Sequence, residues 1–355
     1  MAKKTPSALL EKIRGNSTID ATATLSESKV FTDKDMIPTQ IPMLNVAWSG
    51  TLTGGFTPGV TALAGPSKHF KSGFALTFIK AYFDKYPESV GLFYDSEFGT
   101  PKNYWKTFGI DMNRIVHTPV TDIEELKHDI VQQLHNLERD DRIIIVIDSI
   151  GNLASRKEVE DALEGSSKAD MTRAKQLKSL FRMVTPHLTL KNIPMFIVNH
   201  TYKEQSLFPR DIMSGGTGPM YSSNTVWILG RQQEKEDGKV SGYNFVINVE
   251  KSRFVREKSK ILISVDFEKG ISPWSGLLDV AQETGHIKRT KQKPETYATV
   301  NGSTGEMGPE TKRDDTDTLE FWKSVLQDKT FHQAIERKYK LETPSPLMIG
   351  EEEVD

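Results

Sequence analysis

The sequence predicts an α/β fold built around one mixed β-sheet, which is parallel in its first part and antiparallel at one end. Two observations carry this prediction. Between residues 60 and 198, short apolar runs alternate with helical segments, and this order is typical of a doubly wound parallel sheet. After Gly218 the helical segments stop, and the apolar runs follow one another across short polar turns, as antiparallel strands do.

The parallel part of the sheet is predicted from five short apolar runs and the helices between them. Strands are expected at 60–64, 90–94, 114–118, 143–147 and 193–198. Helices are expected at 72–83, at 103–108, in a segment that Asp122 caps, and at 172–184, where the helix ends before Pro186. The run 143–147 contains only Ile and Val, so we expect a strand that is buried on both faces.

The antiparallel strands are expected at 225–229, 243–249 and 261–267. Beyond them we expect a helix at 276–284, a loop at 301–317 and a last helix at 321–340, with a basic patch at His286, Lys288, Arg289, Lys291 and Lys293. The chain therefore divides into an N-terminal arm over 1–35, a core over 36–272, a small C-terminal α/β domain over 273–341 and an acidic tail over 342–355. The arm holds one amphipathic pattern at Leu9, Leu10 and Ile13.

Composition excludes several classes of protein. The chain has no cysteine, which excludes disulfides and thiolate metal sites and fits a reducing compartment, the cytoplasm. No run of about 18 apolar residues predicts a membrane span, and the start of the chain does not resemble a signal peptide. The net charge of −2 means that any nucleic-acid surface must be local.

A phosphate loop follows the first core strand. Residues 65–72 match the pattern G-x-x-x-x-G-K-[ST] between a strand and a helix, except that Phe70 replaces the second glycine. Backbone N–H groups of such a loop bind phosphate oxygens, so we expect ATP here. Lys71 would reach the β- and γ-phosphates, Ser72 would bind Mg²⁺, and the rest of the loop would contribute Gly65, Ser67, Lys68 and Phe70.

Three further polar residues end predicted strands, at the edge where parallel sheets bind ligands. Asp148 follows the apolar run 143–147 and suits a magnesium-side carboxylate, although it could instead cap the next helix. Glu97 follows the strand 90–94 and could polarise an attacking water, a role for which Asp95 competes. His200 follows the strand 193–198 and could sense the γ-phosphate, although a strand-end histidine is often only structural.

Two long polar segments, about 155–170 and 201–217, also follow strands at this edge. Loops of this length in a compact domain are commonly functional or disordered. Cations with an aromatic residue suit single-stranded nucleic acid, and a solvated loop is the alternative. The candidate DNA-binding residues are Arg156, Lys157 and Lys168 in the first segment and Lys203, Phe208 and Arg210 in the second.

Taken in order, five motifs resemble those of the RecA-type recombinases, including the recombinases of tailed bacteriophages. The motifs lie at 65–72, 93–99, 147–155, 170–175 and 215–221, and the likeness covers roughly residues 18–341. In phage members of the family the phosphate loop also lacks the second glycine. The resemblance implies a RecA-like ATPase core, a host-cell cytoplasmic location if a phage encodes the chain, and an N-terminal arm that docks on an adjacent protomer.

The resemblance also implies residue roles. Glu97 matches the catalytic glutamate, Asp148 the magnesium-side aspartate, and Tyr104 the aromatic residue that stacks on adenine. His200 stands where the wider family has a glutamine that couples the γ-phosphate to the second DNA loop.

Lys251 and Arg253 match a basic pair that reaches the ATP of the neighbouring subunit. A Lys-x-Arg sequence in a strand points both cations to one face, so we expect that arrangement here.

The implied function is a DNA-dependent ATPase that forms a helical filament on single-stranded DNA and catalyses homologous pairing and strand exchange, in recombination, repair and recombination-dependent replication. The expected partners are single-stranded and homologous duplex DNA, other copies of the chain, a single-strand-binding protein and a loading mediator. A hexameric replicative helicase with the same core is an alternative, but we find no separate N-terminal helical domain. A non-hydrolysing recombination mediator is another, but such mediators often lack a residue like Glu97.

Overall fold

The computed structural model describes residues 6–28, 36–139, 141–165, 171–205, 209–236 and 239–341. The chain forms two units, Met1–Asp35 and Met36–Asp355. In the first unit, the amphipathic pattern forms helix α1 (Pro6–Gly15), and none of its residues is buried. Its apolar side chains Leu9, Leu10 and Ile13 are about half exposed. The predicted acidic tail, 342–355, lies outside the described residues.

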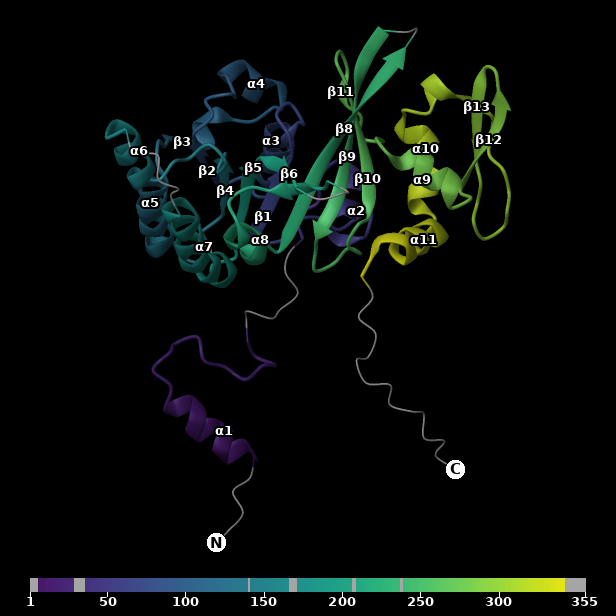
Figure 1. The fold of residues 1–355 in the computed structure, drawn as a ribbon. Coiled ribbons are helices and arrows are strands. Elements are labelled where there is room, and N and C mark those ends of the chain that lie inside the picture. Colours follow the sequence, from purple (N-terminus) through teal and green to yellow (C-terminus); the bar gives the residue numbers. More distant parts are fainter. Residues whose placement is uncertain are drawn as a thin grey trace. The chain divides into compact units, whose positions relative to one another are not determined.

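The second unit is organised by a nine-stranded mixed sheet, with the strand order β11-β10-β9-β8-β1-β5-β4-β2-β3 (Figure 1). All pairs from β3 to β8 are parallel, and the pairs from β8 to β11 are antiparallel, so the predicted mixed sheet is confirmed. The strands are β1 (Gly59–Ala64), β2 (Val90–Asp95), β3 (Ile115–Pro119), β4 (Ile143–Asp148), β5 (Pro194–Asn199), β8 (Thr225–Glu236), β9 (Lys239–Lys251), β10 (Lys260–Asp266) and β11 (Gly270–Ile271).

Helices cover both faces of this sheet, and each face has its own apolar core. Successive residues of β4 alternate between the cores, since Ile144 and Val146 belong to one and Ile145 and Ile147 to the other. The expectation of a strand that is buried on both faces is therefore confirmed. The first core includes α2 (Pro42–Ser49) and α3 (Lys71–Lys85); the second includes α5 (Ile123–Asn136), which Asp122 caps as predicted, and α7 (Thr172–Leu190).

Two predicted helix boundaries are wrong. Pro186 lies inside α7, which continues to Leu190, because Val184 and Leu188 on the same helix keep its apolar face in the core. The predicted last helix is two helices, α10 (Leu319–Gln327) and α11 (Lys329–Tyr339). Asp328 separates them and caps α11, because its side chain accepts a hydrogen bond from the backbone of Thr330.

The C-terminal residues form α9 (Leu277–Glu283) and a small sheet of β12 (Ile287–Gln292), β13 (Glu295–Thr299) and β14 (Thr311–Lys312) beside α10 and α11 (Figure 1). The predicted loop at 301–317 thus contains β14 and a short 3₁₀ helix, η2 (Arg313–Asp315).

The predicted basic patch is reduced by local pairing. His286 is buried and bonded to Thr284 and Thr330, so it does not belong to a surface patch. Arg289 pairs with Glu295, and Lys291 pairs with Glu310 at 2.6 Å. In the described part of the chain, no helix combines the length and the apolarity needed to cross a membrane.

Candidate nucleotide-binding site

The phosphate loop joins β1 to α3, as the sequence predicted. Phe70, which replaces the second glycine, has φ 61° and ψ 22°, in the left-handed region that favours glycine. Its ring stacks on Phe245 of β9 at 5.2 Å and packs edge-on against Phe74 at 5.3 Å. A Cβ atom on Gly73 would lie only 2.5 Å from this ring. The motif lacks a glycine at residue 70, but the chain has one at residue 73. Because Gly73 has no side chain, it leaves room for the Phe70 ring.

The Lys71 side chain folds back against the beginning of the phosphate loop. Its ammonium donates hydrogen bonds to the carbonyl oxygens of Gly65 at 3.1 Å and Pro66 at 2.9 Å. Burial lowers the pKa of Lys71, and the nearby carboxylates of Glu97 and Asp148 oppose that shift. The cation is therefore held where the loop backbone encloses it.

Ser72 and Asp148 come from different elements and meet directly. The Ser72 hydroxyl donates to Oδ2 of Asp148 at 2.6 Å. Asp148 is buried at the end of β4, and its Oδ1 has no hydrogen-bond partner among the residues that the structure describes. Burial raises the pKa of Asp148 to about 6, with smaller contributions from Glu97 and Asp95, while Ser72 and Lys71 act against it. A buried acceptor that lacks a partner fits a cation or its bound water.

The described residues contain no group of three or more His, Cys, Asp or Glu side chains that could hold a metal ion. A cation beside Ser72 and Asp148 would therefore need oxygen ligands from water and from phosphate. Mg²⁺ commonly binds in this way, through one or two protein groups and the phosphates of a nucleotide.

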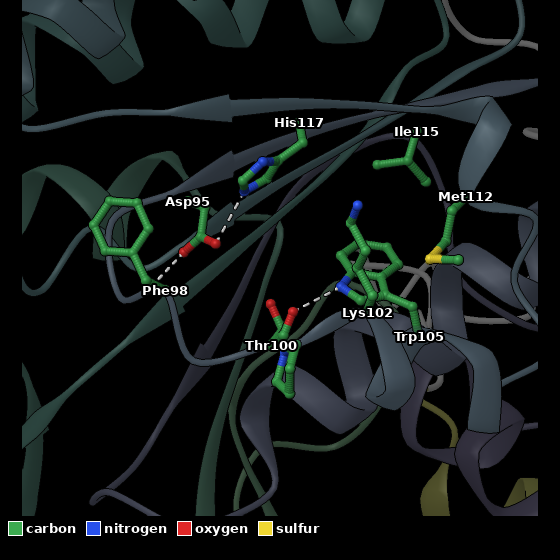
Figure 2. A pocket seen from close by; sticks show the side chains of 9 residues that line it. Asp95, Phe98, Thr100, Lys102, Trp105, Met112, Ile115 and His117 are labelled. Atoms are coloured by element: carbon green, nitrogen blue, oxygen red, sulfur yellow. Dashed lines mark hydrogen bonds and ion pairs between the residues drawn. The ribbon is translucent and has the colours of Figure 1, made fainter.

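The two candidate carboxylates of the β2 turn have different surroundings. Asp95 accepts hydrogen bonds from the backbone N–H groups of Glu97 at 3.1 Å and Phe98 at 2.7 Å. Its other oxygen contacts the ring of His117 at 3.1 Å (Figure 2). Asp95 therefore holds the turn that carries Glu97, and the Glu97 side chain is the one that faces the ends of β4 and β5.

A hollow of about 340 Å³ lies beside Asp95, and Figure 2 shows the side chains that line it. It lies against the edge strand β3 and helix α4 (Lys102–Thr107), and its lining includes Phe98, Thr100, Lys102, Trp105, Met112, Ile115 and His117. The Glu97 turn is thus bounded on one side by an open, largely apolar surface.

Glu97 contacts two side chains through one oxygen atom. Ser149 donates its hydroxyl hydrogen to Oε1 of Glu97 at 2.6 Å, and Nε2 of His200 lies 2.9 Å from the same oxygen. The structure therefore brings together four of the residues that end predicted strands, Asp95, Glu97, Asp148 and His200, at the carboxyl edge of the parallel strands.

The second polar segment is joined to this edge through Asn199 and His200. The Asn199 amide donates to the carbonyl of Ser214 at 2.8 Å, and the backbone N–H of Ser214 donates to the carbonyl of His200 at 2.9 Å. Between them, β6 (Thr201–Lys203) and β7 (Asp211–Met213) form a hairpin, which α8 (Thr217–Ser222) follows. A change at His200 thus has a direct backbone route into this segment.

Tyr104 lies on α4, with its ring 5.2 Å from that of Phe108. Both rings and Phe70 line a cavity of about 650 Å³ between α3, α4 and the turn from β10 to β11. An aromatic wall beside the phosphate loop offers a surface on which a nucleobase could stack.

Lys251 is the last residue of β9, and Arg253 lies beyond the strand. The expectation that one strand face presents both cations is therefore wrong, because the strand ends between them. Lys251 donates to the carbonyls of Met220 and Tyr221, each at 3.0 Å, at the end of α8. Arg253 is exposed. No described hydrogen bond or ion pair joins either residue to the phosphate loop of its own chain.

The first polar segment is not wholly a loop. Residues Arg156–Leu163 form α6, because Ser155 and Glu158 make a reciprocal capping box. The predicted DNA-binding cations mostly have carboxylate partners: Arg156 pairs with Asp122 at 3.4 Å, Lys157 with Asp161 at 2.6 Å, and Lys203 with Asp211 at 3.0 Å. Arg210 is exposed, and Lys168 and Phe208 lie outside the described residues.

Sequence reasoning missed three residues that support the site. Ser149 contacts Glu97, Arg231 donates to the carbonyl of Lys68 at 3.0 Å, and Arg173 donates to three backbone carbonyls after β4. Ser149 and Arg173 lie within the motifs at 147–155 and 170–175, but the motifs do not indicate their contacts. For Arg173 and Arg231 the acceptors are backbone carbonyls, which are present at every residue.

The phosphate loop follows the first core strand, and its serine is bonded to the aspartate that ends β4. These features define a nucleotide-binding protein of the α/β class with a phosphate loop. Two family models match the chain, that of the RecA N-terminal domain at residues 6–272 and that of "Bacteriophage T4, Recombination and repair protein, C-terminal domain" at residues 274–335. The chain belongs to the RecA family of recombinases.

Two sequence relatives agree with this assignment. The chain is 48% identical to the recombination and repair protein of Enterobacteria phage T4, UvsX, over 342 residues, which are 96% of this chain and 88% of that protein. It is 25% identical to Protein RecA of Bacteroides thetaiotaomicron over 288 residues, 80% of this chain and 84% of that one. The crystal structure of the RadB recombinase covers 66% of this chain and 98% of its own, with 18% identity and a TM-score of 0.49. The resemblance to RecA-type and tailed-phage recombinases is confirmed.

Proposed function

We propose that this recombinase is a single-stranded-DNA-dependent ATPase that forms a filament on single-stranded DNA and carries out homologous pairing and strand exchange. The observation that carries the ATPase assignment is the contact between Ser72 and Asp148. It leaves one buried oxygen of Asp148 without a hydrogen-bond partner in the described part of the chain. A buried, partly unsatisfied carboxylate beside a phosphate loop suits a magnesium nucleotide better than it suits a purely structural role.

The geometry at the phosphate loop and membership of the RecA family support the proposed roles. Lys71 and the loop backbone bind the phosphates, with Gly65, Ser67, Lys68 and Phe70 shaping the loop, and Tyr104 stacks on the base. Ser72 and Asp148 hold Mg²⁺. When bound, the ion neutralises charge on the phosphates. Glu97 accepts the proton of the attacking water, and His200 connects this reaction to the second DNA loop.

The site is completed by a second protomer. Among the described residues, no hydrogen bond or ion pair joins Lys251 or Arg253 to the loop of their own chain. We assign both residues to the nucleotide of a neighbour, where they stabilise charge in the transition state. Hydrolysis then depends on filament assembly. The DNA is bound by the segments that contain Arg156, Lys157, Lys168, Lys203, Phe208 and Arg210, after the ion pairs at three of these cations exchange for phosphate.

The remaining parts of the proposal concern location and partners. The recombinase acts in the cytoplasm of a host cell, together with a single-strand-binding protein and a loading mediator. The arm over 1–35 is proposed to dock on the adjacent protomer.

An ATPase assay with and without single-stranded DNA tests the central claim. We expect turnover to rise on addition of DNA, and an unchanged rate would refute the proposal. Electron microscopy of the same mixture distinguishes open helical filaments from the closed hexamers of a helicase.

A further inference from the structure

Arg173 lies on the first turn of α7 and has its donors directed at the chain that leaves β4. Its Nε donates to the carbonyl of Leu153 at 2.8 Å, and its Nη2 donates to the carbonyls of Ile150 at 3.0 Å and Gly151 at 2.9 Å. One guanidinium thus fixes three carbonyls within four residues. The planar fork of an arginine can do this, whereas a lysine ammonium has no such fixed geometry.

The segment that Arg173 fixes adjoins the two residues that contact Glu97. Ser149, which donates to Glu97, immediately precedes Ile150. Gly151 lies against His200, since a Cβ at residue 151 would be 2.6 Å from Cδ2 of the His200 ring. The N–H of Ile150 also donates to the carbonyl of Val198, near the end of β5. Residues 149–151 therefore lie between Arg173 and the catalytic edge.

Arg173 also stands directly after the first polar segment, at the start of the helix that follows it. Any displacement of the beginning of α7 would move the guanidinium and the three carbonyls together. Arginine hydrogen bonds of this kind hold a backbone in one arrangement and hold the groups attached to it.

We infer that Arg173 is a positioning residue that links the first DNA-binding segment to Glu97 through residues 149–151. The inference rests on the proposed function, because it assigns Arg173 to the hydrolysis that Glu97 carries out. The competing role for this cation is a phosphate contact with DNA. The structure favours positioning, because the three observed hydrogen bonds already direct Nε and Nη2 at the protein backbone.

The test compares Arg173→Met with Arg173→Lys in the full-length protein. Arg182→Met is the matched control, because Arg182 is exposed on the same helix and carries the same charge. We expect Arg173→Met to lower kcat at least about tenfold, since small displacements of catalytic groups are costly, while nucleotide affinity stays within about twofold. Arg173→Lys should recover only part of the loss, and Arg182→Met should behave as the parent protein.

A double variant shows whether Arg173 acts through Ser149. If it does, adding Arg173→Met to Ser149→Ala lowers kcat no further than the more damaging single change, because both remove the same constraint on Glu97. Losses that multiply would overturn the inference. So would a normal basal kcat in Arg173→Met combined with weaker DNA binding and a salt dependence reduced by about one phosphate contact.

Hydrogen exchange tests, without an activity measurement, whether Arg173 holds residues 149–151 in place. We expect the amides of Ser149 and Ile150 to exchange faster in Arg173→Met than in the parent protein or in Arg182→Met. Unchanged exchange would contradict the inference even if the parent protein failed to hydrolyse ATP. Failure of DNA to stimulate the parent protein, with faster exchange in Arg173→Met, would instead count against the proposed function alone.

Discussion

The ring of Phe70 occupies the space into which a side chain on Gly73 would project. A Cβ at residue 73 would lie 2.5 Å from Cζ of Phe70, closer than real Cβ contacts come. The ring cannot easily move away, because it is packed between Phe74 and Phe245. The two residues therefore form a matched pair within the phosphate loop and the first turn of its helix.

Exchanging the members of this pair gives the first prediction. We expect Gly73→Ala to destabilise the protein by about 1–3 kcal/mol, the usual cost of overpacking, and to weaken nucleotide binding. Phe70→Gly removes the obstacle, so Gly73→Ala should cost much less in that background. Thermal unfolding and a nucleotide titration of the four proteins measure this coupling. If Gly73→Ala destabilises the parent protein and the Phe70→Gly variant equally, then the Phe70 ring is not what requires a glycine at residue 73.

The second prediction concerns the general base. Glu97→Gln keeps the shape of the side chain and its capacity to accept from Ser149, but it removes the basic oxygen. In the presence of single-stranded DNA, we expect the kcat of ATP hydrolysis to fall about 10²–10⁴-fold, while nucleotide affinity is retained. Asp95→Asn is the comparison, because Asp95 acts on the backbone of the turn. If Glu97→Gln turns over normally, another group must activate the water.

The third prediction follows from the raised pKa of Asp148. Its value of about 6, above the usual 3.8, means that the native protein binds this proton more tightly than the unfolded chain does. The stability gained from that proton is present below about pH 4 and is lost as the pH rises through about 6. In the absence of Mg²⁺, Asp148→Asn should remove this loss and stabilise the protein at pH 7 by up to about 3 kcal/mol.

Denaturant unfolding at pH 5 and pH 7.5, with the parent protein and Asp148→Asn side by side, checks this expectation. Mg²⁺ needs the ionised carboxylate, so magnesium-dependent nucleotide binding by the parent protein should weaken below about pH 6. A stability difference between the two proteins that does not change with pH would contradict the assignment.

The fourth prediction concerns the cation supplied by a neighbour. Arg253→Ala should lower turnover in filaments while it spares nucleotide binding by the isolated protomer. Lys71→Ala should abolish nucleotide binding or turnover.

An equal mixture of the two variants should recover about a quarter of the parent activity, because head-to-tail assembly places an intact loop beside an intact Arg253 at about one interface in four. No recovery in mixed filaments would count against a site shared between protomers.

The parts of the fold that the sequence predicted are those fixed by local patterns. The run 143–147 specified a central strand, and the loop that contains Lys71 and Ser72 specified the start of a helix. Because parallel strands end at one edge, the sequence predicts that Glu97, Asp148 and His200 lie at the same edge of the sheet. The structure adds the contact between Glu97 and His200.

The parts that escaped prediction depend on tertiary contacts. Pro186 stays within a helix because of the core beneath it, and α6 forms in a segment that is polar enough to read as a loop. The sequence does not distinguish Lys251 from Arg253, although the strand ends between them. Arg173 recognises carbonyl oxygens, which carry no sequence information.

The bonds that Lys251 makes to the end of α8 have a consequence for conformational entropy. A free lysine side chain has about 2 kcal/mol of rotamer entropy to lose when it is immobilised. In this protomer the two carbonyls of Met220 and Tyr221 already restrict that freedom before any second subunit arrives. An ammonium group has three N–H bonds, and these carbonyls accept from two of them. The third N–H bond of Lys251 can therefore donate to an anion on another molecule. Binding that anion costs little further side-chain entropy, because folding has already ordered the Lys251 side chain.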